Sequence, residues 1–145
     1  FAAMIWLRRI SLALGLLTLT LWAGIVHLPV WLPPVTPAIL EAQPEPGQGP
    51  HRMFGYATLT NPAIRLAVTG RVTPARKARL PGFRREGRDM RPDPDATLPG
   101  VVFSVDDRGL LRLDRYERLG ARYRRDRATL TDGSRAWVYR VIRDD

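Results

Sequence analysis

Glu117 is the ionisable side chain whose position most needs a chemical explanation. It lies in the segment 109–120, GLLRLDRYERLG, which two glycines bracket and whose spacing predicts a short amphipathic helix. Leu110, Leu113 and Tyr116 share one apolar stripe at about 100° per residue, and Glu117 projects into that stripe. Burial against apolar side chains raises the pKa of a carboxyl group, and a raised pKa suits a general acid or base near neutral pH.

A second interpretation of this helix stays open. Glu117 at the helix end could instead form a surface ion pair with Arg118, Arg122 or Arg125, a contact of little energetic weight. Asp114, at the edge of the apolar stripe, is expected to be a solvated helix residue. The two interpretations differ in whether Glu117 faces a cavity or the solvent.

The residue inventory limits which other chemistry is available. The chain has no cysteine, and its two histidines, His27 and His51, precede the segment 52–145. A thiol nucleophile, a histidine-containing triad and a zinc–thiolate or histidine cluster are therefore excluded from that segment. Acid–base chemistry there must use a carboxylate, a tyrosine or an arginine-assisted group, and we expect neither a metal nor a cofactor.

The elements that must position Glu117 form a mixed α+β domain. Asn61 and Pro62 begin a short helix that ends before Gly70, and Asp132-Gly133 joins two strands in a hairpin. We expect a strand that leads into a loop within 52–59, one or two strands within 71–86 (broken at Pro81-Gly82), strands at 101–105, 123–130 and 135–142, and a loop rich in Asp and Pro at 87–99. About six strands with one or two helices predict a small barrel-like or curved sheet.

Six short segments, in this order along the chain, carry a resemblance. They are Gly55-Tyr56-Ala57-Thr58-Leu59, Ala78-Arg79-Leu80-Pro81-Gly82-Phe83, Leu98-Pro99-Gly100-Val101-Val102-Phe103, Leu113-Asp114-Arg115-Tyr116-Glu117, Tyr123-Arg124-Arg125 and Ala136-Trp137-Val138-Tyr139. Together they resemble the gamma-glutamylcyclotransferase-like family, of the avirulence-induced-gene type, over about residues 52–142.

The resemblance implies a fold and a reaction. In that family, gamma-glutamyl amines are cyclised to 5-oxoproline with release of the amine, inside a small mixed barrel. Glu117 matches the catalytic Glu, which would act first as a base and then as an acid. The loop Tyr56, Ala57, Thr58 and Leu59 would present backbone N–H groups to the substrate, with Tyr123 as a further contact.

Three of these positions have a second interpretation. The family usually has Gly where this chain has Ala57, and a requirement for positive φ there would alter the pocket. Tyr56 and Tyr123 are each equally well explained as core aromatic residues with one hydrogen-bond partner.

The N-terminal part of the chain is predicted to be a membrane anchor. No Asp, Glu, Lys or Arg occurs between Ile10 and Leu40, and residues 10–32 as a helix would extend about 34 Å, enough to cross a bilayer core. A cleaved secretory signal is the alternative, but the apolar run exceeds the usual length and no small-x-small site follows it. Arg8 and Arg9 predict a cytoplasmic N-terminus with the following domain on the outer, periplasmic face.

The chain thus divides into an anchor (1–32), a Pro-rich linker (33–51) and a basic domain (52–145). Seven prolines between positions 29 and 50 predict an extended spacer. His27, one helical turn before Trp31, has a spacing seen in pigment-binding helices, although an interfacial histidine is the simpler explanation. Arg8 and Arg9 balance Glu41 and Glu45, so the net charge of +9 falls on the domain.

Two functions are compatible with these features. The first is a membrane-anchored enzyme of the gamma-glutamylcyclotransferase type that acts on a small gamma-glutamyl substrate. The second is a non-catalytic accessory subunit, in which the anchor and the basic domain bind a larger membrane protein complex. Nucleic acid is not expected as a partner, because the arginines are spread over every predicted element and no nucleic-acid-binding motif accompanies them.

Overall fold

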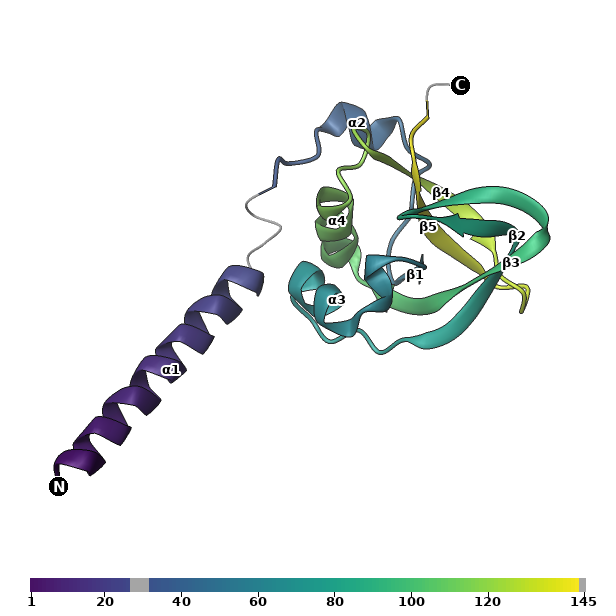
Figure 1. Ribbon diagram of the computed structural model, residues 1–145. Helices are drawn as coiled ribbons and strands as arrows, with labels where there is room; N and C mark the ends of the chain where they lie inside the picture. Colours follow the sequence, from purple (N-terminus) through teal and green to yellow (C-terminus); the bar gives the residue numbers. More distant parts are fainter. Residues whose placement is uncertain (27–31, 144–145) are drawn as a thin grey trace.

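The computed structural model describes residues 1–26 and 32–143. Its elements are α1 (Ala2–Val26), α2 (Pro37–Glu41), β1 (His51–Gly55), the 3-10 turn η2 (Thr58–Thr60), α3 (Pro62–Thr69), β2 (Arg76–Glu86), β3 (Asp89–Val105), α4 (Asp107–Tyr116), β4 (Tyr123–Thr129) and β5 (Arg135–Val141). Figure 1 shows the strands curling into a half-barrel beside helices α3 and α4, with α1 extending away. The predicted α+β class, a small barrel-like sheet with short helices, is confirmed.

The five described strands form one sheet in the order β2-β3-β1-β5-β4. All neighbours are antiparallel except β1 and β5, which pair in parallel. The turn after β4 reaches back to the opposite edge, where the backbone N–H of Thr131 donates to the carbonyl of Arg79 at 3.0 Å. This contact between the two ends of the strand order keeps the sheet strongly curled.

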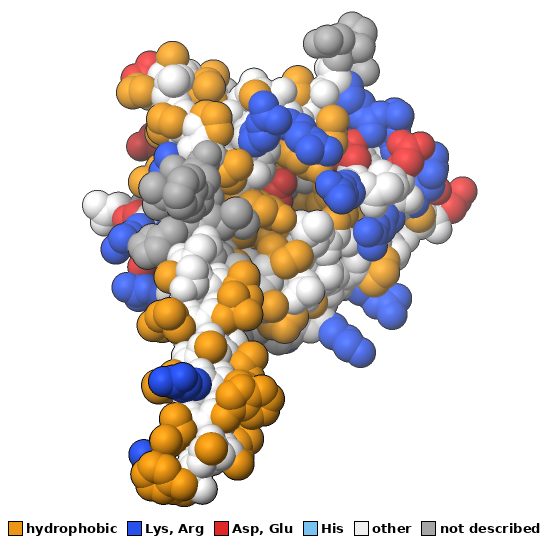
Figure 2. Space-filling model, turned by 60° about the vertical axis from the view of Figure 1, so that its left-hand side comes forward, with side chains coloured by type: hydrophobic (Ala, Val, Ile, Leu, Met, Phe, Trp, Pro, Cys, Tyr) orange, Lys and Arg blue, Asp and Glu red, His pale blue; other side chains and the backbone are white. Residues whose placement is uncertain are grey.

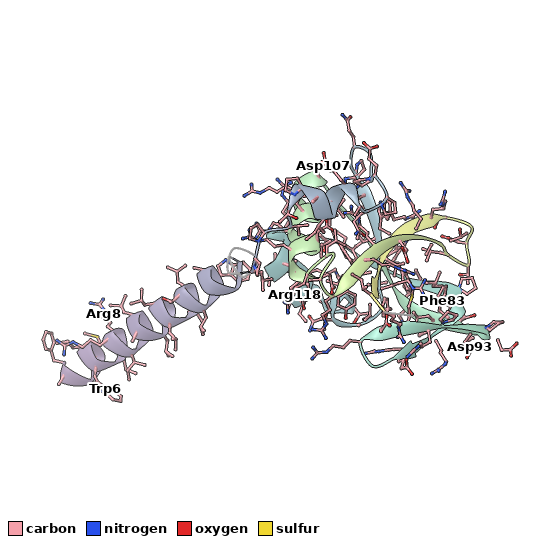
Figure 3. All side chains as sticks on the ribbon, turned by 90° about the horizontal axis from the view of Figure 1, so that it is seen from above. Trp6, Arg8, Phe83, Asp93, Asp107 and Arg118 are labelled. Atoms are coloured by element: carbon pink, nitrogen blue, oxygen red, sulfur yellow. The ribbon has the colours of Figure 1, made fainter. Side chains whose placement is uncertain are left out.

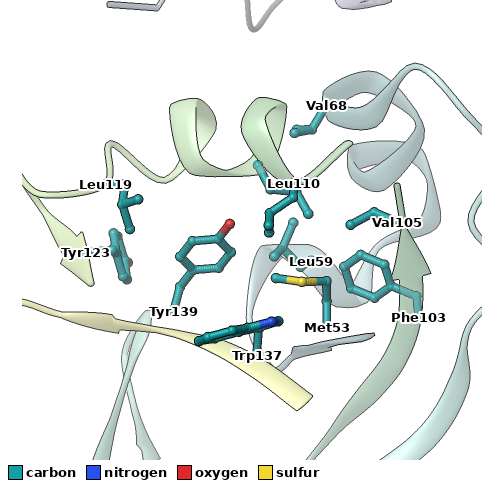
Figure 4. Packing of buried hydrophobic residues seen from close by; sticks show 11 residues of the cluster. Met53, Leu59, Val68, Phe103, Val105, Leu110, Leu119, Tyr123, Trp137 and Tyr139 are labelled. Carbon is teal, nitrogen blue, oxygen red and sulfur yellow. The ribbon is translucent and has the colours of Figure 1, made fainter. Parts of the chain in front are cut away.

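Both faces of the sheet carry buried side chains. Alternate residues of a strand point to opposite faces, so neighbouring residues enter different clusters. Met53 packs into the cluster under α3 and α4, whereas its neighbour Phe54 packs into a second cluster on the other face. In β5 the same alternation sends Trp137 and Tyr139 to the first cluster and Val138 to the second. Figure 4 shows the first cluster, with the hydroxyl of Tyr139 pointing toward the helices.

Helix α3 has the predicted limits. Asn61 is its N-cap, and its side-chain oxygen accepts a hydrogen bond from the N–H of Ala63 at 2.9 Å. Pro62 occupies the first turn, and Gly70 ends the helix in the left-handed conformation with φ 72°. The hairpin around Asp132-Gly133 is also confirmed, with Tyr123 of β4 opposite Val141 of β5.

The prediction of a loop at 87–99 is wrong. Strand β3 begins at Asp89 and pairs with β2 through Pro92 and Pro99, so β2 and β3 form a long hairpin. Only Val101–Val105 of β3 has a second neighbour, β1. Proline lacks a ladder donor, and it is tolerated here because the first part of β3 has a neighbour on one side only.

The expectation of a purely extended linker is also wrong. Pro37–Glu41 forms the short helix α2, which Thr36 caps through a hydrogen bond from the N–H of Ile39 to its hydroxyl at 3.4 Å. Ile39 and Leu40 pack against the main core cluster. The side chain of Gln43 also accepts a hydrogen bond from the N–H of Arg125 at 3.1 Å. The linker is therefore partly folded onto the domain.

Helix α1 is longer at its start than the predicted span. Its segment Ala2–Gly24 is long and apolar enough to cross a membrane, although a signal sequence would have the same properties. Figure 2 shows mainly hydrophobic side chains on this helix apart from two arginines near its start, and many more Lys and Arg side chains on the domain. Residues 27–31, with His27 and Trp31, lie outside the described residues, so the pigment hypothesis is not addressed.

Candidate active site

A pocket of about 230 Å³ lies where the end of β1 meets the end of α4. It joins the two segments that the sequence indicated, the loop Tyr56–Leu59 and Glu117, and Tyr123 also lines it. Its remaining lining residues are Phe54, Gly55, Arg88, Tyr116, Arg118, Arg122 and Tyr139. The six predicted site residues are thus brought together.

The loop after β1 forms one wall of this pocket. Its chain turns through η2, in which the N–H and the hydroxyl of Thr60 both donate to the carbonyl of Ala57, at 3.1 and 2.7 Å. Within the described part of the chain, the backbone N–H groups of Ala57, Thr58 and Leu59 have no hydrogen-bond acceptor. These donors are available to an anion or to a carbonyl oxygen in the pocket.

Ala57 does not have the positive φ that favours glycine. Its φ is −124°, which is negative, so the concern about Ala at this position does not apply to this fold. Gly55 is the residue at which a side chain is excluded, because a Cβ there would lie 2.8 Å from the Cβ of Leu59. The missing side chain at Gly55 lets the loop fold back against the strand.

Glu117 is placed by the way that α4 ends. The helix stops at Tyr116, four residues before the predicted end, and Glu117 is its C-cap. The N–H of Arg118 bonds the carbonyl of Arg115, and the N–H of Leu119 bonds that of Asp114 at 2.9 Å, which is the Schellman pattern. This turn fixes Glu117 beside the pocket instead of continuing the helix.

The carboxyl group of Glu117 is half-buried and unpaired. Among the described residues, no Arg or Lys nitrogen lies within ion-pair distance of it, and no donor hydrogen-bonds to it. Burial raises its pKa to about 7, and Arg122 lowers it only partly. The surface ion pair with Arg118, Arg122 or Arg125 is therefore not formed, and the carboxyl can exchange a proton near neutral pH.

The floor of the pocket rests on a buried polar network. The Tyr56 hydroxyl donates to the carbonyl of Tyr139 at 2.7 Å, and the Tyr139 hydroxyl donates to Asp114 at 2.6 Å. Nη1 of Arg125 donates to both oxygens of Asp114, at 2.9 and 2.7 Å. The expectation that Asp114 is solvated is wrong, because its side chain is 0% exposed and turns toward the sheet.

The tyrosines have a structural role whether or not they contact a ligand. Burial raises the pKa of Tyr56 and of Tyr123, so both hydroxyls stay protonated at neutral pH. Tyr116 links the two walls, because its hydroxyl donates to the Thr58 hydroxyl at 3.3 Å. The Tyr123 hydroxyl donates to the carbonyl of Arg88 at 3.4 Å and holds the turn between β2 and β3 against the pocket.

Sequence reasoning missed Tyr139 and the three arginines of the pocket. Tyr139 belongs to an alternating strand, and that pattern indicates burial without indicating a pocket. Arg88 comes from a hairpin that was not predicted. Arg118 and Arg122 lie in an irregular turn, and no sequence pattern indicates where side chains of such a turn point. Among the residues that the structure describes, no group of three or more His, Asp and Glu residues could hold a metal ion.

Comparisons with known proteins identify a family and a shared fold. A family model described as gamma-glutamyl cyclotransferase, AIG2-like, matches residues 53–145, which is more than half of the chain. A search of curated protein sequences gives no significant match.

Solved structures share the fold. The solution structure of one Arabidopsis thaliana protein has a TM-score of 0.55 and 26% sequence identity, and the match covers 66% of this chain and 70% of that chain. A second solution structure from Arabidopsis thaliana has a TM-score of 0.53 and 18% identity, over 69% of this chain and 66% of the other. A structure described as gamma-glutamyl cyclotransferase has a TM-score of 0.54 and 13% identity, over 67% and 69%.

Proposed function

We propose that this chain, which belongs to the gamma-glutamyl cyclotransferase, AIG2-like family, converts a gamma-glutamyl amide into 5-oxoproline and a free amine. The observation that carries the proposal is the pocket itself. It combines an unpaired carboxyl group whose pKa is near 7 with a loop of backbone N–H donors that lack acceptors.

The reaction needs one proton to be moved and no group from outside. The substrate's own α-amine attacks the γ-carbonyl carbon, so a new C–N bond closes the five-membered ring. Glu117 takes the proton that the attacking nitrogen loses and gives it to the departing nitrogen as the original amide bond breaks. Water is not consumed, and no covalent bond to the protein forms.

The loop after β1 can stabilise negative charge on the bound substrate and in the transition state. Backbone N–H groups of Ala57, Thr58 and Leu59 can donate to the α-carboxylate of the glutamyl group or to the developing oxyanion of the γ-carbonyl. Such donors require no reorganisation during the reaction, because η2 and the hydrogen bond between Tyr116 and Thr58 hold the loop in place. The buried tyrosines Tyr56 and Tyr123 shape the space around the glutamyl chain.

The products in water labelled with ¹⁸O test the proposal against simple hydrolysis. With gamma-glutamyl-alanine and the full chain in mild detergent, we expect 5-oxoproline and alanine in equal amounts, without ¹⁸O in the 5-oxoproline. Glutamate that carries ¹⁸O in its γ-carboxyl group would show that water, and not the α-amine, attacks the carbonyl. Mass spectrometry distinguishes the two products.

The proposal includes attachment of the domain to a membrane through α1. The segment Ala2–Gly24 is about 34 Å long as a helix, which matches a bilayer core of about 30 Å. We expect the full chain to stay in the membrane fraction after washing with alkaline carbonate, as shown by immunoblotting. Release of a shortened chain that lacks α1 would identify a cleaved signal instead.

A further inference from the structure

The segment 32–43, which we call the strap, lies against the turn that carries Glu117. It precedes β1 and includes the short helix α2. Figure 1 shows α2 beside the chain that leads from α4 to β4. Its apolar side chains are partly buried and pack on the core cluster under α3 and α4, namely Val35, Ile39 and Leu40. The strap therefore has a defined place on the domain.

Two hydrogen bonds hold the strap on either side of the turn 117–122. Before the turn, Nε of Arg115 donates to the carbonyl of Leu32 at 2.8 Å. After the turn, the backbone N–H of Arg125 donates to Oε1 of Gln43 at 3.1 Å. Because β4 is the last strand in the described sheet order, the side chain of Gln43 supplies an acceptor at the edge of that sheet. The strap thus spans the turn from one side to the other.

Ile39 makes the contact within the turn itself. Gly120 has a φ of 80°, and a Cβ on this residue would overlap Cγ2 of Ile39 and lie 3.1 Å from its Cγ1. The side chain of Ile39 therefore occupies the space that a side chain at position 120 would need. The N–H of Gly120 also donates to the carbonyl of Tyr123 at 2.8 Å, which closes the turn between α4 and β4. Ile39 covers this closed turn from outside.

The turn determines where the carboxyl group of Glu117 lies. Glu117 is the C-cap of α4, and the buried side chains of Leu119 and Tyr123 attach the following residues to the core. Among the described residues, none donates a hydrogen bond to the Glu117 carboxyl group or forms an ion pair with it. The position of this group therefore depends on the backbone of the turn, and on whatever holds that backbone in place.

The chain between the strap and β1 holds the other end of α4. The N–H of Gly49 donates to Oδ1 of Asp107 at 2.9 Å, and Nε2 of His51 lies 2.6 Å from the same oxygen. Figure 3 labels Asp107, the first residue of α4, and Arg118, which follows its C-cap. The segment that precedes the domain thus contacts α4 at its start and the turn at its end.

We propose that the strap is part of the catalytic unit and that Ile39 is a positioning residue, which holds the turn 117–122 and so directs the carboxyl group of Glu117 into the pocket. The inference rests on the proposed function and adds a requirement to it. The family model matches from residue 53, so this part of the unit lies outside the matched segment. Loosening the strap lets the carboxyl group move, and fewer bound substrates are then aligned for proton transfer.

Ile39→Ala tests this role in the full chain in mild detergent. The substitution removes the atoms that contact Gly120 and should lower kcat for gamma-glutamyl-alanine by about tenfold, with KM changed by less than about twofold. KM is expected to change little because the loop after β1, which binds the glutamyl group, forms another wall of the pocket. Ile39→Val keeps Cγ1 and Cγ2 and should restore most of the natural kcat. Ile64→Ala is the matched control, because it deletes the same atoms from a side chain of α3 that packs on the same cluster, and it should keep kcat.

The possible outcomes separate this inference from the proposed function. An unchanged kcat in Ile39→Ala, an equal loss in Ile64→Ala, or a loss confined to KM would overturn the role of Ile39 and leave the cyclotransferase intact. Absence of turnover by the natural chain would overturn the proposed function. In that event, hydrogen exchange measured by mass spectrometry decides the role of the strap. The amides of residues 118–123 should exchange at least about tenfold faster in Ile39→Ala than in Ile64→Ala, and equal exchange would reject it.

Discussion

Replacing Glu117 with Gln is expected to lower kcat/KM for 5-oxoproline formation by about 10²- to 10⁴-fold, the usual contribution of a positioned acid–base group. The substitution keeps the shape of the side chain and removes its ability to take and return a proton. No cysteine or histidine lines the pocket to replace it. Glu41→Gln is the matched control, because it removes an exposed carboxylate from α2 and should leave the rate unchanged.

The pH profile supplies a second signature of the same side chain. Since Glu117 must be ionised to accept the proton and burial raises its pKa to about 7, kcat/KM of the natural chain should fall as the pH falls through about 7. The residual activity of Glu117→Gln should lack this limb. If Glu117→Gln keeps more than one tenth of the natural activity and its kcat/KM still falls as the pH falls through about 7, another group performs the proton transfer.

The same pKa has a consequence for stability. The folded chain holds the Glu117 proton up to about pH 7, whereas the ordinary pKa of an exposed Glu is 4.5. The unfolded state therefore binds fewer protons in this window, and the contribution of this group to the free energy of unfolding falls as the pH rises from about 4.5 to about 7. Gln has no proton to lose in this window, so Glu117→Gln is expected to be at least as stable as the natural chain at neutral pH, which circular dichroism checks.

Replacing Asp114 with Ala is expected to lower the free energy of unfolding by about 3–5 kcal/mol, because it leaves a buried charge without its partner. Arg125 is 2% exposed, and both of its described carboxylate contacts are to Asp114. Its Nε already has no hydrogen-bond partner among the described residues. The substitution also removes the acceptor of the Tyr139 hydroxyl, so the floor of the pocket loses its support. Urea unfolding followed by circular dichroism measures the change.

Two comparisons identify the cause of that loss. Asp126→Ala breaks the more exposed contacts to Arg124 and Arg140 at 3.1 and 3.6 Å, and should cost no more than about 1 kcal/mol. Adding Arg125→Met to Asp114→Ala should recover part of the stability, since the unpaired charge is then gone. If Asp114→Ala is no more destabilising than Asp126→Ala, or if Arg125→Met lowers the stability further, the buried Asp114–Arg125 pair does not account for this part of the free energy of unfolding.

Local signals in the sequence identified most of the elements. Asn61, Pro62 and Gly70 defined α3, and Asp132-Gly133 defined the hairpin of β4 and β5, because caps and tight turns depend on neighbouring residues only. The segment 87–99 was misassigned because Asp and Pro usually indicate a loop. Whether a proline fits a strand depends on whether that strand has one neighbour or two, and this is a property of the whole sheet.

The candidate site was predictable to a smaller extent. Helical periodicity correctly placed Glu117 beside apolar side chains, although the helix ends before it and a Schellman turn sets its direction. Asp114 was misassigned because its partners Arg125 and Tyr139 lie on separate strands, which a helical pattern does not reveal. The three arginines of the pocket had no signal for a related reason, since Arg88 meets Arg118 and Arg122 only when the β2–β3 hairpin is folded beside the turn after α4.

Release of 5-oxoproline from gamma-glutamyl-alanine, measured side by side for the natural chain and for Glu117→Gln at pH 7.5, is the most direct test of the account. We predict steady release by the natural chain and a rate reduced at least about 10²-fold in the variant, with the two proteins equally folded by circular dichroism. No release by the folded natural chain, or equal release by both proteins, would contradict the claim that Glu117 in this pocket performs the cyclisation.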